Sequence, residues 1–199
     1  MLPKEIDCPS ARLLDVLARR RSRTGGTVSS NSLASLLWHT CQLRERRSDG
    51  RFGRWESRPC PSAGGIHAIR LLVLPLETMG DVGVYDDDVH ALRLAAKAPD
   101  QAIALNAASV LNLTGAKLGV TLQFVADPSR LSDCYDNHET LLWRDAGAFS
   151  AMICLVAEAL GMSSVTLGRH GTDIVRSFGI DAPLVGVGGV HLGCRDQPA

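Results

Sequence analysis

The most regular hydrophobic pattern in this chain of 199 residues lies between positions 139 and 160. Apolar residues recur there in steps of four and three, at positions 142, 146, 149, 153, 156 and 160. The spacing predicts one long helix over 139–160, because residues three and four apart share a helix face. A second row makes its later half apolar nearly all round: Leu141, Ala148, Met152, Leu155 and Ala159. Such a helix must be buried on more than one side, either as a central core helix or as a helix shared with a second subunit.

Shorter patterns predict helices and strands on both sides of the long helix. Helical spacing predicts three further helices, at 11–21, 33–43 and 101–111. Ser29 or Ser30 can cap the second of these, and Pro128 can begin another short helix. Apolar runs bounded by glycine and aspartate turns predict strands at 69–76, 82–85, 90–95, 117–125, 165–167 and 183–192. The polar segment 44–57 is predicted to be an exposed loop.

The composition is that of a single folded domain. A chain of 199 residues with 45% hydrophobic content can bury one sizeable core, so we expect one domain over 1–199, with a helical region at 1–17. The N-terminus has no apolar signal core. The longest uncharged run of the long helix, 146–157, has twelve residues and is too short to span a bilayer. These features predict a cytoplasmic protein that binds no membrane.

Charge and cysteine usage narrow the classes of function. The net charge is zero, but residues 1–58 carry twelve Lys+Arg against six Asp+Glu. A basic third could hold nucleic acid, yet aromatic residues are only 5% and no nucleic-acid-binding signature accompanies the arginines, so we expect no nucleic-acid partner. The six cysteines lack Cys-x-x-Cys spacing and the histidines have no partners at ligand spacing, so we expect neither a disulfide scaffold nor a metal site.

Two segments carry candidate chemistry. The first, 58–67, contains Ser62, Ala63 and Gly64 between a proline pair and a strand, where small residues let a flat ligand approach the backbone. The second, 19–23, has four arginines around one serine, which are the donors of a phosphate clamp. Together they indicate a phosphorylated planar cofactor. The arginines could instead be solvated charge at a helix C-terminus, and Ser62 could be an ordinary turn and helix cap.

These segments, in this order, resemble those of the nitroreductase-like flavoproteins, and most closely the SagB/McbC-type dehydrogenase branch of thiazole- and oxazole-peptide clusters. The resemblance covers roughly residues 18–193. Its motifs are Arg20-Arg21-Ser22, Leu36-Leu37-Trp38, Pro61 to His67, Gly83-Val84-Tyr85, Asp145-Ala146-Gly147 and Glu158 to Met162.

The resemblance implies an α+β nitroreductase-like fold, with a mostly antiparallel central sheet flanked by helices and a homodimer formed around the long helices. It implies FMN as cofactor. The implied FMN contacts are Arg20, Ser22 and the adjacent Arg21 at the phosphate, Ser62, Ala63 and Gly64 at the isoalloxazine ring, Leu167 and Gly168 at N5, and Gly188 and Gly189 near the phosphate tail. Leu167-Gly168 could equally be a strand end, and the Gly188-Gly189 pair a bulge.

The likeness is weaker at the catalytic position. Azoline-oxidising members have a Lys-Tyr pair where this chain has Cys134 and Tyr135, so we predict Tyr135 as the catalytic residue, with a structural tyrosine as the alternative. Thr24 stands where the family often has a basic residue, a role that Arg23 or Arg195 could take. The implied activity is FMN-dependent dehydrogenation of a peptide-derived or azoline-type substrate, or reduction of a nitro or quinone compound. The alternative is a degenerate family member that binds a partner or peptide.

Overall fold

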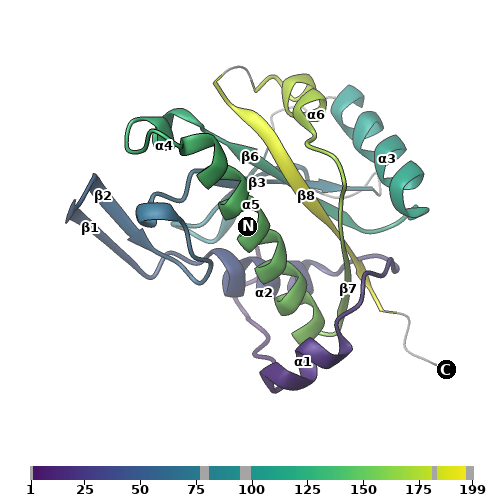
Figure 1. The fold of residues 1–199 in the computed structure, drawn as a ribbon. Coiled ribbons are helices and arrows are strands. Elements are labelled where there is room, and N and C mark those ends of the chain that lie inside the picture. Colours follow the sequence, from purple (N-terminus) through teal and green to yellow (C-terminus); the bar gives the residue numbers. More distant parts are fainter. Residues whose placement is uncertain (1, 77–80, 95–99, 181–182, 196–199) are drawn as a thin grey trace.

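A six-stranded antiparallel sheet forms the centre of the fold (Figure 1). The computed structural model describes residues 2–76, 81–94, 100–180 and 183–195. The strands stand in the order β5-β4-β3-β6-β8-β7. Their bounds are β3 Ile69–Pro75, β4 Gly83–Asp86, β5 Ala91–Leu94, β6 Val120–Ala126, β7 Met162–Thr166 and β8 Val185–Cys194. The predicted α+β class with an antiparallel sheet is confirmed.

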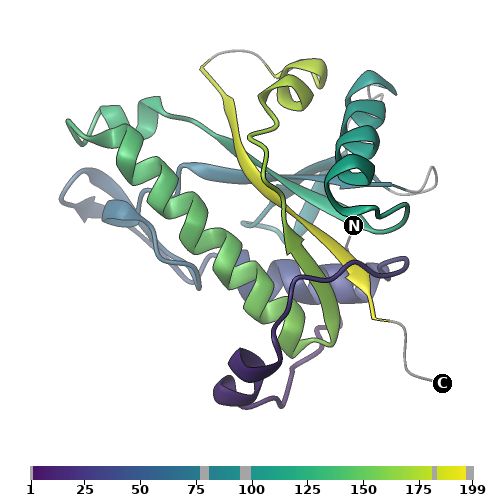
Figure 2. The same cartoon turned by 45° about the vertical axis from the view of Figure 1, so that its right-hand side comes forward.

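The helices cover both faces of this sheet (Figures 1 and 2). Their bounds are α1 Leu13–Arg19, α2 Ser30–Cys41, η1 Ala63–Gly65, α3 Asp100–Thr114, α4 Ser129–Ser132, α5 His138–Ala159 and α6 Thr172–Ser177. Alternation along β3 divides the core, because successive strand residues point to opposite faces. Leu71 and Val73 belong to the core that contains α2 and α5, whereas Leu72 and Leu74 belong to the core beneath α3 and α6.

The long helix α5 lies within one residue of its predicted bounds at each end. Leu142, Ala146 and Ile153 of its main apolar row are buried against the sheet and α2. Its second row, which includes Met152 and Leu155, is only half-buried in the single chain. The helix has the length and mean hydropathy of a membrane span, 1.3 over its most apolar window, but its buried row makes it a core helix.

Several elements differ from the sequence prediction. The segment 44–57 is exposed as expected, but it forms the antiparallel hairpin β1 (Glu45–Gly50) and β2 (Gly53–Ser57) rather than a loop. The residues of its strands are mostly charged, so no apolar alternation predicted them. Cross-strand ion pairs support the pairing, such as that between Arg46 and Glu56, which face each other. The sequence prediction also missed α6, made α1 too long and placed β7 three residues late. The last residue of the predicted strand 90–95 lies outside the described residues.

Candidate functional site

Asp145 on α5 holds the segment 61–67, which we call the platform. The Ser62 hydroxyl donates to the Asp145 carboxylate at 2.6 Å, and the Ala63 N–H donates to the same carboxylate at 3.1 Å. The N–H of His67 in turn donates to Ser62 Oγ at 3.0 Å. Ser62 therefore does not cap η1, as the sequence suggested, but joins the platform to the long helix. Asp145, recognised from sequence only as part of a motif, is the anchor.

The two platform glycines are required by the protein's own packing. Gly64 and Gly65 have φ of 61° and 66°, which favours glycine. A Cβ at Gly64 would lie 2.7 Å from the Tyr135 hydroxyl oxygen, and one at Gly65 would collide with the Trp55 indole. The rings of Tyr135 and Phe52, from the hairpin, meet edge to face at 4.8 Å between centroids. The structure thus brings Tyr135 to the platform, beside Gly64.

His67 ends the platform in a strained conformation. Its φ of 48° is uncommon for a residue with a side chain and is maintained by surrounding hydrogen bonds. Its ring Nε2 lies 3.0 Å from the Glu56 carbonyl oxygen, and its own carbonyl accepts from Arg70 and Arg130. Burial, together with the nearby Arg58 charge, lowers the pKa of His67 to about 4, so the ring is neutral at physiological pH.

The predicted phosphate clamp, Arg20 to Ser22, lies beside β7. Ser22 forms a parallel bridge with Ser164 of that strand. The Arg21 guanidinium donates to the carbonyls of Ala18 and Arg20, both at 2.9 Å, and so caps the end of α1. No side-chain hydrogen bond or ion pair engages the side chains of Arg20 and Ser22 within the described residues. These two remain available to a ligand.

A buried carboxylate near the clamp was not recognised as functional from sequence. Glu158, at the end of α5, is 4% exposed and forms an ion pair with Arg195. Arg19 approaches the same carboxylate at 3.6 Å. Arg195 is therefore close to the clamp but its charge is already paired. The sequence did contain a signal for this ion pair: Glu158 is a single acid in an otherwise apolar helix end, and a buried acid needs a basic partner.

The remaining predicted cofactor residues continue from β7. The Leu167 N–H donates to the Gly189 carbonyl at 2.9 Å, and the Gly188 N–H donates to the His170 carbonyl at 3.0 Å. Among the described residues no hydrogen bond uses the Gly168 N–H, and open space surrounds this exposed glycine. Gly168 is thus the member of the Leu167-Gly168 pair whose N–H is free. A Cβ at Gly189 would lie 2.8 Å from the Leu122 carbonyl, so strand packing requires that glycine.

The structure places the predicted site residues at different levels along α5. The phosphate clamp, 20–22, bridges to Ser164, and its neighbour Arg19 approaches Glu158, whereas the platform binds Asp145; these two acids are thirteen positions apart, about 20 Å along the helix axis at 1.5 Å per residue. Gly188 lies nearer the platform end, because its N–H donates to the carbonyl of His170, whose ring lies 4.8 Å from that of Trp143 on α5. Figure 1 shows α1 near one end of α5 and the hairpin near the other.

The donors present suit FMN. An unpaired guanidinium and a hydroxyl fit a phosphate, and a free backbone N–H fits a ring nitrogen. Within one chain the phosphate clamp, 20–22, and the platform lie near different ends of α5.

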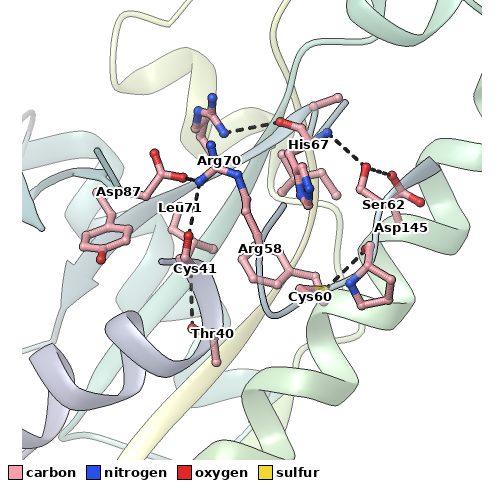
Figure 3. A pocket seen from close by; sticks show the side chains of 15 residues that line it. Thr40, Cys41, Arg58, Cys60, Ser62, His67, Arg70, Leu71, Asp87 and Asp145 are labelled. Atoms are coloured by element: carbon pink, nitrogen blue, oxygen red, sulfur yellow. Dashed lines mark hydrogen bonds and ion pairs between the residues drawn. The ribbon is translucent and has the colours of Figure 1, made fainter. Parts of the chain in front are cut away.

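A cavity lies beneath the platform, between α2, β3, β4 and α5 (Figure 3). It offers about 40 Å³ to the centres of water-sized molecules, which is room for a few waters or a small ion and too little for a flavin. Cys41 and Cys60 line it. Burial raises the pKa of Cys41 to about 12 and that of Cys60 to about 11, so both thiols stay protonated and are poor nucleophiles. Nothing in the sequence pattern indicated this cavity.

The comparisons with known proteins identify the fold. No family model matches the chain, and no curated protein matches it. A nitroreductase structure from Ralstonia eutropha JMP134 is 21% identical, with a TM-score of 0.71 over 99% of this chain and 89% of the other. The E. coli microcin synthetase McbBCD complex matches at 15% identity, with a TM-score of 0.69 over 98% of this chain and 77% of the other.

A nitroreductase in complex with FMN from Desulfovibrio desulfuricans matches at 17% identity, with a TM-score of 0.62 over 94% of this chain and 88% of the other. Identities this low establish similarity of fold. The chain therefore has the nitroreductase fold.

Proposed function

We propose that this protein is an FMN-dependent oxidoreductase of the SagB/McbC type. The observation that carries the proposal is the combination, on a nitroreductase fold, of an unpaired Arg20 and Ser22 beside β7 with a free Gly168 N–H just beyond the end of that strand. The nitroreductase from Desulfovibrio desulfuricans has this fold and was solved in complex with FMN. An FMN-dependent nitroreductase from Clostridium difficile also has this fold.

Each group of residues has a distinct task in this proposal. Bound FMN supplies hydride transfer, as flavins do. Arg20 and Ser22 bind the phosphate through charge-assisted hydrogen bonds, and the Gly168 N–H donates to the ring. Asp145 fixes the platform through Ser62 and Ala63, which face the ring. The hydroxyl of Tyr135, beside Gly64, donates or accepts the substrate proton.

The proposal includes a homodimer, because the clamp and the platform of one chain lie near different ends of α5. A second copy can bring its platform to the clamp of the first. The surface that would pair is apolar: Leu13, Leu14 and Leu17 of α1 are 64%, 73% and 51% exposed. The half-buried second row of α5 adds to it. Exposed apolar surface of this kind is typical of obligate interfaces.

We infer that the protein acts in the cytoplasm. Its substrate is either a peptide-derived or azoline-type compound that it dehydrogenates, or a nitro or quinone compound that it reduces. The likeness to a microcin synthetase supports the former. The alternative is a pseudoenzyme that binds a partner or peptide. Two departures from the family pattern favour the pseudoenzyme: Cys134 stands in the position of the family lysine, and Thr24 stands in place of a basic residue.

The absorption spectrum of the purified protein tests the proposal. A yellow protein with a flavin band, loaded one FMN per chain, supports the oxidoreductase. A colourless protein that gains no band with added FMN contradicts it and favours the pseudoenzyme. Light scattering on the same sample tests the dimer separately. A flavin-loaded, folded monomer at micromolar concentration would reject the shared site and leave the cofactor assignment intact.

A further inference from the structure

Two cationic groups without carboxylate partners lie at or beside the cavity beneath the platform. Arg70 of β3 lines the cavity and donates to the His67 carbonyl at 3.3 Å. Arg130 of α4 lies outside the lining and donates to the same carbonyl at 3.1 Å. Neither guanidinium forms an ion pair with any carboxylate of the described residues. Two cations therefore converge on one neutral oxygen atom.

The neighbouring acids already have partners, although two of them line the cavity. Glu56 is shared by Arg46, Arg54 and Arg58. Asp87 lines the cavity and pairs with Arg58. Asp145, the other carboxylate in the lining, accepts from the platform.

Arg58 also lines the cavity; its charge is paired with Glu56 and Asp87, but one of its N–H groups has no acceptor. Its side chain is 5% exposed, and its Nε has no hydrogen-bond partner although it is buried. A buried N–H without an acceptor is unfavourable, and this one belongs to a cation that lines an open volume. Burial, followed by the charges of Arg58 and Arg130, lowers the pKa of Arg70, as expected for a cation without a counterion.

The backbone is shaped around these arginines. His67 adopts its left-handed conformation with its carbonyl turned to Arg70 and Arg130 and its N–H on Ser62. Strain of this kind is found where the structure fixes a functional geometry. Figure 3 shows Arg58, Arg70 and His67 grouped at one side of the cavity. The neutral thiols and the neutral His67 ring add no negative charge there.

We propose that this cavity binds a small oxyanion, a carboxylate or a phosphate, through Arg70 with support from Arg58 and Arg130. A guanidinium presents paired N–H donors that match two oxygens of such an anion. The 40 Å³ available fits an ion of this size or the terminal group of a larger molecule. The site is distinct from the clamp and does not depend on the flavin assignment.

Isothermal titration of the purified protein with sodium acetate and, separately, sodium phosphate tests the site, with chloride holding the ionic strength constant. The wild type should bind at least one of the two anions. Arg70→Gln should weaken that binding by roughly ten- to a hundredfold, since it removes charge-assisted hydrogen bonds, and Arg130→Gln should weaken it by a smaller factor, since it removes only a nearby charge. If only acetate saturates the site, the natural ligand carries a carboxylate; if only phosphate saturates it, the natural ligand carries a phosphate. Arg20→Ala separates the clamp, because phosphate bound in the cavity should survive that change.

Arg93→Gln is the matched control. Arg93 is an exposed arginine of the same sheet that pairs with Asp86, and its loss should leave the anion affinity unchanged. Equal weakening by Arg93→Gln, binding unaffected by both test variants, or no binding above that of chloride would each overturn the proposal. If Arg70→Gln does not fold, as judged by circular dichroism, Arg130→Gln decides, because its side chain lies on the short peripheral helix α4.

Discussion

The platform and the clamp differ in how completely one chain specifies them. The platform has a fixed hydrogen-bond partner for nearly every polar group: Ser62 and Ala63 are bound to Asp145, and His67 is held on three sides. The clamp is joined to the fold mainly through backbone contacts, and the side chains of Arg20 and Ser22 face solvent or lie half-buried without partners. One region is organised by the protein itself, whereas the other has donors that only a ligand or a second chain can satisfy.

This difference separates two kinds of residue requirement. At the platform, Tyr135 and Trp55 fill the space beside Gly64 and Gly65, so packing within the chain requires glycine at these two positions. At Gly168 nothing lies within 4 Å of a would-be Cβ, so packing within the chain does not require a glycine there. Changes at Gly64 and Gly65 should therefore alter stability, and changes at Gly168 or the clamp should alter ligand affinity alone.

The largest effect is expected from Tyr135→Phe. If the hydroxyl beside Gly64 transfers a proton, its removal should slow substrate turnover by roughly 10²–10⁴-fold, the usual contribution of general acid–base catalysis. Stopped-flow absorbance of the flavin measures this rate, either as reduction of the oxidised flavin by an azoline peptide or as reoxidation of the reduced flavin by a quinone. The ring should keep its contact with Phe52, so bound flavin and the unfolding midpoint should stay at wild-type levels. Unchanged turnover would make Tyr135 a packing residue.

The second effect concerns Arg20→Ala, which should weaken FMN binding by roughly ten- to a hundredfold because charge-assisted bonds to a dianionic phosphate are lost. Fluorescence titration measures the affinity. Riboflavin, which has no phosphate, should bind wild type and variant equally. Arg47→Ala is the control, since Arg47 pairs with Glu45 on the hairpin at 2.6 Å, near the other end of α5. Equal losses in the two variants would indicate a general basic surface instead of a clamp.

Sequence patterns predicted those parts of the molecule whose signals are local. The periodicity of 139–160 and the apolar run of β3 located the long helix and a central strand, because burial imposes their spacing. The hairpin was missed because charge pairs, such as Arg46 with Glu56, replace apolar alternation in it. The bond between Ser62 and Asp145 spans 83 positions, so no local pattern could have indicated it. The motif resemblance supplied the candidate site residues, but their positions along α5 needed the fold.

A smaller effect is expected from Asp145→Asn. The amide keeps the size of the side chain but loses the charge that strengthens the bonds from Ser62 and Ala63. Urea unfolding should show a loss of about 1.5 kcal/mol in the free energy of unfolding, the lower bound for hydrogen bonds to a charged group. Glu139→Gln, on an exposed position of the same helix, should change stability by less than about 0.5 kcal/mol. A variant as stable as wild type would mean that the platform does not depend on this anchor.

The smallest effect is a pH dependence that belongs to the platform and is absent from the clamp. The pKa of His67 is lowered to about 4 by burial and by Arg58, from an ordinary value of 6.5. Between these two values the unfolded chain binds the proton and the folded chain does not, so stability must fall as the pH drops from 6.5 to 4. The loss should be about 1 kcal/mol, because the half-buried ring is partly screened by solvent. His67→Gln should remove this contribution while Arg20→Ala retains it, as urea midpoints across the same range would reveal. A wild-type decline that persists unchanged in His67→Gln would assign the titration to another group and leave the platform without its pH-sensitive residue.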